Sequence, residues 1–180
     1  MRPIILALCV SSAACSGQPL NSPTSPTAAT VANPATAATL AAAQTLAQGG
    51  AQLPFDGSLR AVENDVIAPP NLLADGTAKG EATHLGRFTA TFTAVVDLAT
   101  STSTGTFDFT AANGDHLLAT FTGLGVTIEP GVASITEVAT VVGGTGRFAA
   151  TTGTFTVRRV LAMTTGVSSG SFDGHINLNN

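Results

Sequence analysis

The chain has 180 residues, a formal net charge of −4 and only seven Lys and Arg side chains. This balance argues against nucleic acid or an anionic membrane surface as a partner. Charged residues make up 10% of the chain, so Thr, Ser, Asn and Gly must form much of the surface. At this length we expect one folded domain.

The first residues follow the pattern of a bacterial lipoprotein signal. Arg2 precedes a short apolar run at residues 3–10, and small residues then lead to a cysteine. The tetrapeptide S-A-A-C that ends at Cys15 resembles a lipobox, with Ser where Leu is usual. We therefore expect a signal peptide over residues 1–14 and a lipidated Cys15 in the cell envelope, outside the cytoplasm. The run is too short to span a bilayer, so only the lipid would contact the membrane. A plain secretory signal is the alternative.

Residues 15–52 are rich in Pro, Thr and Ala and lack bulky apolar side chains. Such a composition offers too little burial to offset the entropy of ordering, so a low-complexity tether is predicted. All nine Phe residues lie at or after Phe55. The folded domain is therefore assigned to residues 53–180.

The domain has the residue alternation of β-strands. Between Phe88 and Val96, Phe and Ala alternate with Thr, which is typical of a strand with one buried face. The stretch Thr77–Asp97 exceeds one ordinary strand and is expected to bend near residues 84–87. Loops are expected at residues 69–76 and 123–131, and Asn113-Gly114 predicts a two-residue type I′ hairpin turn.

About eight strands result, separated by turn signals at roughly ten-residue spacing, with no convincing amphipathic helix after residue 52. This pattern is typical of an antiparallel sandwich or barrel. A closed barrel leaves no exposed strand edge, so the prediction is an all-β, eight-stranded antiparallel closed barrel.

Gly-x-Phe recurs at five places, the first at Gly86 and the last at Gly170. On a strand, residues two apart share a face, so each Gly leaves room for a Phe from a neighbouring strand or permits a bend in the wall.

Three motifs carry a resemblance to a known family. They are A-T-H-L-G-R-F ending at Phe88, A-N-G-D ending at Asp115, and G-G-T-G-R-F ending at Phe148. Together they resemble bacterial secreted proteins related to the allene oxide cyclase and dirigent barrels, over about residues 55–178. The resemblance implies an eight-stranded calycin-like barrel with a central apolar pocket, and a homo-oligomer. The catalytic acidic and arginine residues of the plant enzymes have no assignable counterpart, so no catalytic residue is carried over.

Two charged residues fall on strand faces that are otherwise apolar. Glu137 shares strand parity with Val141, and Arg159 shares parity with Phe155. If these faces point inward, both charges lie inside the barrel as a polar anchor or an acid/base at the pocket floor. The alternatives are a structural ion pair or, with the parity reversed, two exposed residues.

The function favoured by the sequence is binding of a small apolar molecule within the barrel. The candidate pocket residues are Glu137, Arg159, His84, Phe88, Phe92, Phe107, Phe109 and Phe155. One alternative is a cyclase, isomerase or dirigent-like coupling guide in which Glu137 or Arg159 polarises a reactive intermediate. Another is a structural envelope protein with a filled barrel, because eight strands suit either interior.

The domain offers little for a metal or cofactor. His84, His116 and His175 are widely spaced, and no cysteine lies among them. Three separate strands would have to converge to bring them together, so neither a metal nor a cofactor is expected. His84, beside Arg87 at the expected bend, either lines the pocket rim or holds the bend through a hydrogen bond.

Overall fold

The computed structural model describes residues 51–178, which form β-strands and one short 3₁₀ helix. The elements are β1 (Gln52–Pro54), β2 (Gly57–Ala68), β3 (Asn71–Ala82), β4 (Gly86–Asp97), β5 (Thr102–Thr110), β6 (His116–Glu129), β7 (Val132–Gly144), η1 (Gly146–Phe148), β8 (Thr152–Ala162) and β9 (Val167–Asn177). The predicted signal peptide and Cys15, and the predicted tether up to residue 50, lie outside the described residues.

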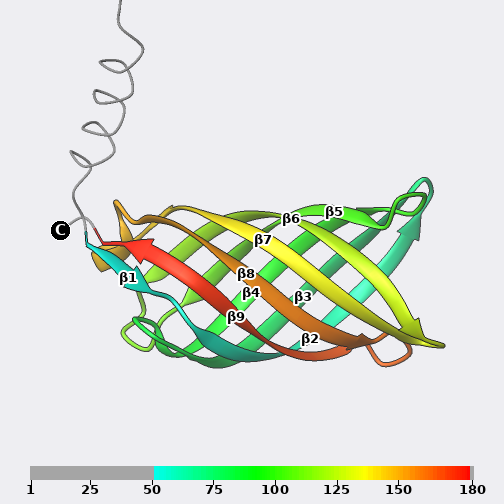
Figure 1. The fold of residues 1–180 in the computed structure, drawn as a ribbon, viewed down its shortest axis with the longest axis horizontal. Helices are drawn as coiled ribbons and strands as arrows, with labels where there is room; N and C mark the ends of the chain where they lie inside the picture. Colours follow the sequence, from blue (N-terminus) through cyan, green and yellow to red (C-terminus); the bar gives the residue numbers. More distant parts are fainter. Residues whose placement is uncertain (1–50, 179–180) are drawn as a thin grey trace, which may run out of the picture. The chain divides into compact units, whose positions relative to one another are not determined.

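Strands β2 to β9 form a closed barrel, which confirms the predicted fold class. Each strand pairs antiparallel with the next along the chain, and β9 pairs with both β8 and β2 (Figure 1). The short β1 pairs with the last residues of β9, where β2 has not yet begun. Eight antiparallel strands therefore surround one interior, with β1 extending the wall beside β9.

We divide the barrel along its axis into two halves, which we call the closed half and the open half and which differ in content. The closed half contains the β3–β4, β5–β6 and β7–β8 connections, and β1 and the end of β9 lie there. The open half contains the β2–β3, β4–β5, β6–β7 and β8–β9 connections. In Figure 1 the closed half is on the left and the open half on the right.

Phenylalanine rings fill the closed half. Phe155 lies 5.1 Å from Phe55, 5.6 Å from Phe172 and 5.9 Å from Phe109, measured between ring centroids. Edge-on and tilted pairs at these distances add specific attraction to the burial of apolar area. This ring cluster makes the closed half a solid core.

Glycine on one strand accommodates phenylalanine on the next at several places, but among the five Gly-x-Phe glycines only Gly105 does so. A Cβ added at Gly105 would lie 2.4 Å from the ring of Phe121 on β6. The same distance separates a Cβ at Gly76 from the ring of Phe92 on β4. Any larger residue at Gly105 or Gly76 would collide with these rings.

Three local predictions were wrong. Asp75-Gly76 lies within β3, and most of the predicted loop at residues 123–131 continues β6, which reaches Glu129. The connection after β5 spans residues 111–115 and is not a type I′ turn, because Gly114 has a positive φ and Asn113 does not. The chain turns at residues 83–85, close to the bend predicted at residues 84–87, and β7 and β8 flank the G-G-T-G-R-F segment.

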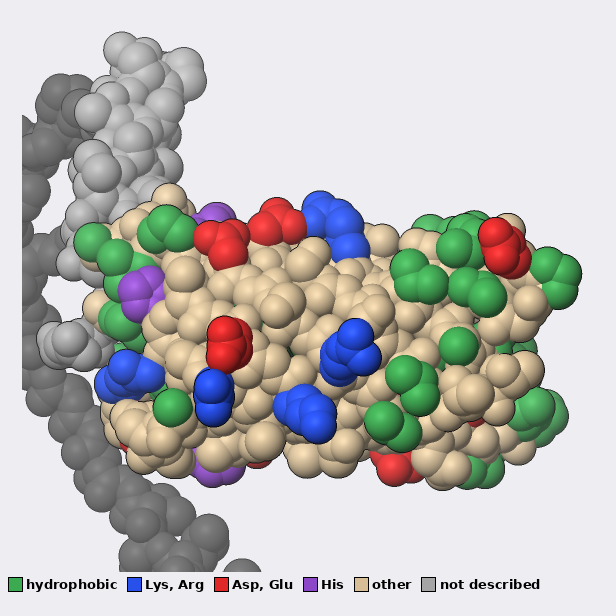
Figure 2. Space-filling model, turned by 90° about the horizontal axis from the view of Figure 1, so that it is seen from below, with side chains coloured by type: hydrophobic (Ala, Val, Ile, Leu, Met, Phe, Trp, Pro, Cys, Tyr) green, Lys and Arg blue, Asp and Glu red, His purple; other side chains and the backbone are tan. Residues whose placement is uncertain are grey.

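The outer wall also differs between the halves. Exposed apolar side chains lie mainly around the open half, whereas Lys and Arg lie nearer the middle and the closed half (Figure 2). The apolar set comprises Val62, Val66, Leu73, Val95, Leu124, Val126, Ile128, Val138, Val160 and Val167. The middle of the wall is mostly threonine, which suits a strand face in contact with water.

Candidate functional site

Three charged side chains meet inside the open half. They are Glu63 on β2, Glu137 on β7 and Arg159 on β8, and each is buried. Arg159 Nε and Nη2 donate to Glu137 Oε2 and Oε1 at 3.3 and 3.1 Å, a two-pronged contact. Arg159 Nη1 donates to Glu63 Oε2, and also to Ser168 Oγ at 3.2 Å. We call Glu63, Glu137 and Arg159 the charged triad.

Each member of the charged triad lies opposite a glycine on a neighbouring strand. Glu63 pairs with Gly76, Glu137 with Gly123 and Arg159 with Gly170. A Cβ at Gly123 would lie 3.0 Å from Glu137 Cγ, and one at Gly170 would lie 2.8 Å from Arg159 Cβ. The glycines on β6 and β9 therefore provide the room that these two long charged side chains occupy within a narrow barrel.

The charged triad rests on the aromatic core. The guanidinium carbon of Arg159 lies 5.2 Å from the centroid of the Phe92 ring, within cation–π range. Phe92 in turn lies 6.0 Å from Phe107, so it joins the ring cluster below to the charges above. Phe92 marks the boundary between the two halves.

The buried charges do not balance one another. Two carboxylates face one guanidinium, so the triad has a formal charge of −1 when both acids are ionised. Burial raises the pKa of Glu63 above its ordinary value of 4.5, because desolvation outweighs the attraction of Arg159. Burial alone would lower the pKa of Arg159, but the attraction of Glu137 and Glu63 holds it above its ordinary value. Burial thus makes the carboxylate of Glu63 easier to protonate than that of an exposed glutamate.

A cavity of about 400 Å³ lies above the charged triad and opens at the end of the barrel. This volume is at the small end of the range of about 300–1,000 Å³ for ligand pockets. Its apolar lining includes Ile67, Leu72, Val96, Ile135, Leu161 and Met163. Its charged lining consists of Glu63, Asp65, Glu137 and Arg159. The site combines an apolar wall with a charged floor.

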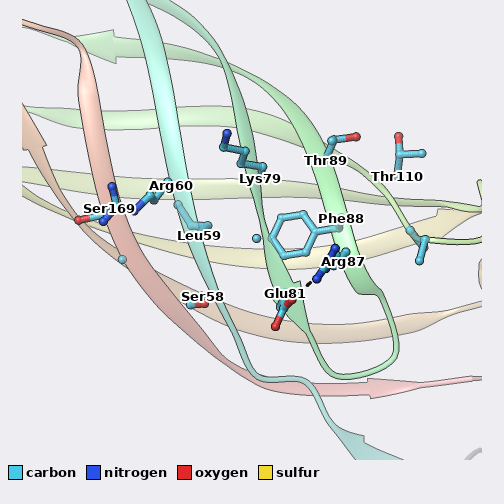
Figure 3. Close-up of a pocket in the computed structure, with 14 residues that line it drawn as sticks. Ser58, Leu59, Arg60, Lys79, Glu81, Arg87, Phe88, Thr89, Thr110 and Ser169 are labelled. Atoms are coloured by element: carbon cyan, nitrogen blue, oxygen red, sulfur yellow. Dashed lines mark hydrogen bonds and ion pairs between the residues drawn. The ribbon is translucent and has the colours of Figure 1, made fainter.

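A broader hollow of about 910 Å³ lies on the outer wall (Figure 3). It is lined by Arg60, Lys79, Arg87 and Glu81, with Arg87 directed toward Glu81 and paired with it at 3.2 Å. Both members of this pair are strongly exposed, so water screens their charges. A shallow surface with solvated charges offers less for specific recognition than the cavity within the barrel, where the charged triad is buried.

The predicted pocket residues separate into three groups. Glu137 and Arg159 both point inward and line the cavity, and they form the ion pair that was one of the alternatives; the reversed parity is wrong. Phe92 lies beneath them, under Arg159. The remaining phenylalanines do not line this cavity, because they pack against one another in the closed half; they are Phe88, Phe107, Phe109 and Phe155.

His84 does not line the cavity, so the first of its two expected roles, a place at the pocket rim, is wrong. It lies between β3 and β4 in the closed half, at the end of the barrel away from the cavity, with a φ of 63°. Its carbonyl oxygen accepts a hydrogen bond from the guanidinium of Arg147, and the backbone N–H of Arg147 donates to Asp115. Arg147 thus joins two connections of the closed half.

Sequence reasoning missed Glu63 and Asp65. Both continue the alternation that begins with Leu59 and Ala61, whose side chains are buried on the inward face of β2. Extending that parity by one step places Glu63 on the inward face, and a second step reaches Asp65.

Within residues 51–178, no three His, Cys, Asp or Glu side chains come together in a way that suits a metal ion. His116 Nδ1 lies 2.7 Å from Asp108 Oδ1 on the adjacent strand, outside the cavity. No helix in this part of the chain is long and apolar enough to cross a membrane.

Fold and site together define a closed β-barrel with a charged cavity at one end. Comparison with protein-family models, curated protein sequences and solved structures finds no match to this chain. The resemblance to allene oxide cyclase and dirigent barrels therefore remains an expectation from the three sequence motifs.

Proposed function

We propose that this protein binds a small, mainly apolar molecule in the cavity of the open half. The observation that carries the proposal is the cavity of about 400 Å³, open at the barrel end, beside buried, hydrogen-bonded charges. An apolar wall supplies affinity by removing surface from water, and a few fixed polar groups orient the ligand. The signal-like residues 1–14 and Cys15 support a place in the bacterial cell envelope, outside the cytoplasm and held by a lipid.

Gly125 offers a direct way to block the cavity. It lines the cavity, and the nearest atom to an added Cβ would be Ser101 O at 3.9 Å, which is ordinary contact distance. Gly125→Leu should therefore fill the cavity without displacing the backbone. Val126→Leu adds bulk to the next residue, which faces outward and is 52% exposed, and serves as the matched control.

The test is native mass spectrometry of the full-length chain with Cys15→Ser, so that no acyl chain of its own enters the cavity. The protein is incubated with a metabolite and lipid extract of its source and then gently purified. A discrete bound mass that persists in Val126→Leu and disappears in Gly125→Leu supports the proposal. A bare mass under conditions in which a known ligand-binding barrel keeps its ligand contradicts it.

A second candidate function is catalysis as a cyclase, an isomerase or a coupling guide. One observation favours it: Glu63 is buried beside the cavity, and burial raises its pKa toward the range of a general acid. In this case the cavity would hold a reactive intermediate in one conformation while Glu63 or Arg159 polarises it. A captured ligand that leaves the protein chemically changed, and does so more slowly from Glu63→Gln, would favour catalysis over simple binding.

A further inference from the structure

The charges that line the cavity are unbalanced. Glu63, Asp65 and Glu137 supply three negative charges, and Arg159 supplies one positive charge, which gives a formal charge of −2. No Lys or His is among the cavity-lining residues. The lining therefore has an excess of negative charge, which a positively charged ligand would reduce.

Arg159 has little left to offer a ligand. Its Nε and Nη2 bond to Glu137, and its Nη1 bonds to both Glu63 and Ser168. Both oxygens of Glu137 are likewise in use. Little of the guanidinium is therefore left to bind an anionic ligand, which the nearby carboxylates would repel.

Glu63 retains a free acceptor. Its Oε2 accepts from Arg159, while its Oε1 has no hydrogen-bond partner within residues 51–178 and is not among the fully enclosed polar atoms. Asp65 lies two residues further along β2 and lines the same cavity. These two carboxylates lie on the inward face of one strand, next to the apolar wall.

We propose that the ligand is an apolar organic amine whose ammonium group contacts Glu63 and Asp65, while its hydrocarbon part lies against Leu72, Ile135 and Leu161. This inference rests on the proposed function and adds the charge of the ligand to it. The ammonium replaces the missing positive charge, and a charge-assisted hydrogen bond to Glu63 Oε1 is the strong kind of contact. The hydrocarbon part buries apolar area against the wall, which favours binding.

Amine binding should be coupled to a proton. The charged groups around Glu63 are Arg159 from β8, Glu137 from β7 and Asp65 on its own strand; β3 and β9 place Gly76 and Ser168 beside it. An ammonium binds the ionised form of Glu63, so affinity should rise as pH rises through the pKa of that carboxyl. A neutral acceptor that needs the protonated carboxyl would show the opposite trend.

Three probes with one hydrocarbon tail test the charge. Octylammonium, octanol and octanoate are titrated into the full-length Cys15→Ser protein by calorimetry, and the binding place is checked from the methyl resonances of the cavity wall. One charge-assisted hydrogen bond predicts that octylammonium binds about tenfold or more tightly than octanol, with octanoate weakest. Octylammonium affinity should also rise with pH.

Glu63→Gln should remove the preference for octylammonium over octanol while leaving octanol binding intact, and Asp65→Asn should reduce it. Glu81→Gln, which alters an exposed carboxylate on the outer wall, should leave the preference unchanged. Each variant is also tested for octanol binding, alone and with Gly125→Leu added. Octanol binding that Gly125→Leu abolishes shows that the variant still forms the cavity.

The outcomes separate the two proposals. If octanol binds in the cavity as tightly as octylammonium, the ammonium inference is overturned and the proposed binding function stands. If none of the three probes shifts the methyl resonances of the cavity wall, both are overturned. If calcium ions displace octylammonium, the site is a metal site and the inference is again overturned.

Discussion

The closed and open halves of this barrel are built on the same strands yet have different interiors. On β6 the inward residues change from Leu117 and Phe121 to Gly123 and Gly125 within a few positions. Where rings face inward they fill the interior, whereas the cavity is lined by aliphatic and charged side chains and by Gly125, with no aromatic ring among them. Strand number permits either interior in an eight-stranded barrel, so the inward residues of each strand decide which one forms.

The halves also use opposite means to remain stable. In the closed half, ring contacts and apolar burial stabilise the fold directly. In the open half, buried charges require one another, because removing one partner leaves the other without compensation in a poorly solvated place. The predictions below test this division, beginning with the largest expected effect.

Phe155→Ala should cost the most stability, because this ring contacts several others at the centre of the closed half. Loss of a buried Phe side chain typically costs about 4 kcal/mol. Met163→Ala, on the cavity wall with its side chain 44% exposed, should cost about 0.5 kcal/mol or less. Urea unfolding followed by far-UV circular dichroism suits a chain that has no Trp and no Tyr. Equal losses in the two variants would remove the distinction between the halves.

Arg159→Met should cost about 3 kcal/mol at neutral pH, because Glu63 and Glu137 would remain buried without their partner. The adjoining cavity admits water, which limits the cost. Arg158→Met, one residue away on the outward face, loses only an exposed pair with Asp173 and should cost less than about 0.5 kcal/mol.

The difference in stability between these two variants should narrow as pH falls. The unpaired carboxylates of Arg159→Met then become protonated and no longer carry a buried charge. Unfolding curves at neutral and acidic pH measure this directly. A loss in Arg159→Met no greater than that in Arg158→Met would mean that the charged triad does not support the open half.

The outline of the fold was predictable from the sequence, because alternation depends only on neighbouring residues. Phe88 and Phe92 indicate the inward face of β4. Glu137 and Arg159 share parity with apolar residues that prove to be inward, so their side could be inferred without knowledge of the register. Strand pairing then follows from chain order, since each strand joins its neighbour through a short connection.

The cavity was not predictable in the same way. Its position depends on which inward residues reach the same level of a tilted barrel, and that is set by register between strands. Gly123 and Gly125 suggested a loop because glycine is common in turns, whereas here they leave room for Glu137 and for the cavity. Glu63 lacked any signal except parity, and its contact with Arg159 spans 96 positions of the chain.

The open half should show a distinctive dependence on pH. Because the pKa of Glu63 in the folded chain lies above its ordinary 4.5, the folded chain binds this proton more tightly than the unfolded chain does. The contribution of Glu63 is therefore fully present below the ordinary value, and it is lost as pH rises through the folded pKa. Glu63→Gln should weaken this decline, and Asp65, whose pKa burial also raises, should account for some of what remains.

Asp97 provides a control of opposite sign. The N–H groups of Thr100 and Ala99 donate to its carboxylate and lower its pKa below 3.8. Its contribution is present above that value and is lost as pH falls, so Asp97→Asn should remove stability at neutral pH rather than flatten the decline. Unfolding midpoints measured every half unit between about pH 3 and 8 distinguish the two, a range that brackets both ordinary values. Identical profiles for Glu63→Gln and the unsubstituted chain would contradict the assignment.

The smallest effects concern two buried hydroxyl groups, one in each half. Ser168 Oγ accepts a hydrogen bond from Arg159 in the open half, whereas Thr151 Oγ1 in the closed half is enclosed and has no hydrogen-bond partner within the described residues. Ser168→Ala should cost about 1 kcal/mol, because the guanidinium loses one acceptor. Thr151→Val should cost nothing or stabilise the fold slightly, because it replaces an unpaired polar atom with a methyl group of similar size. Urea midpoints of the two variants decide the matter. A loss from Thr151→Val as large as that from Ser168→Ala would show that the closed half also depends on a buried polar contact, and the contrast between an apolar and an electrostatic half would no longer hold.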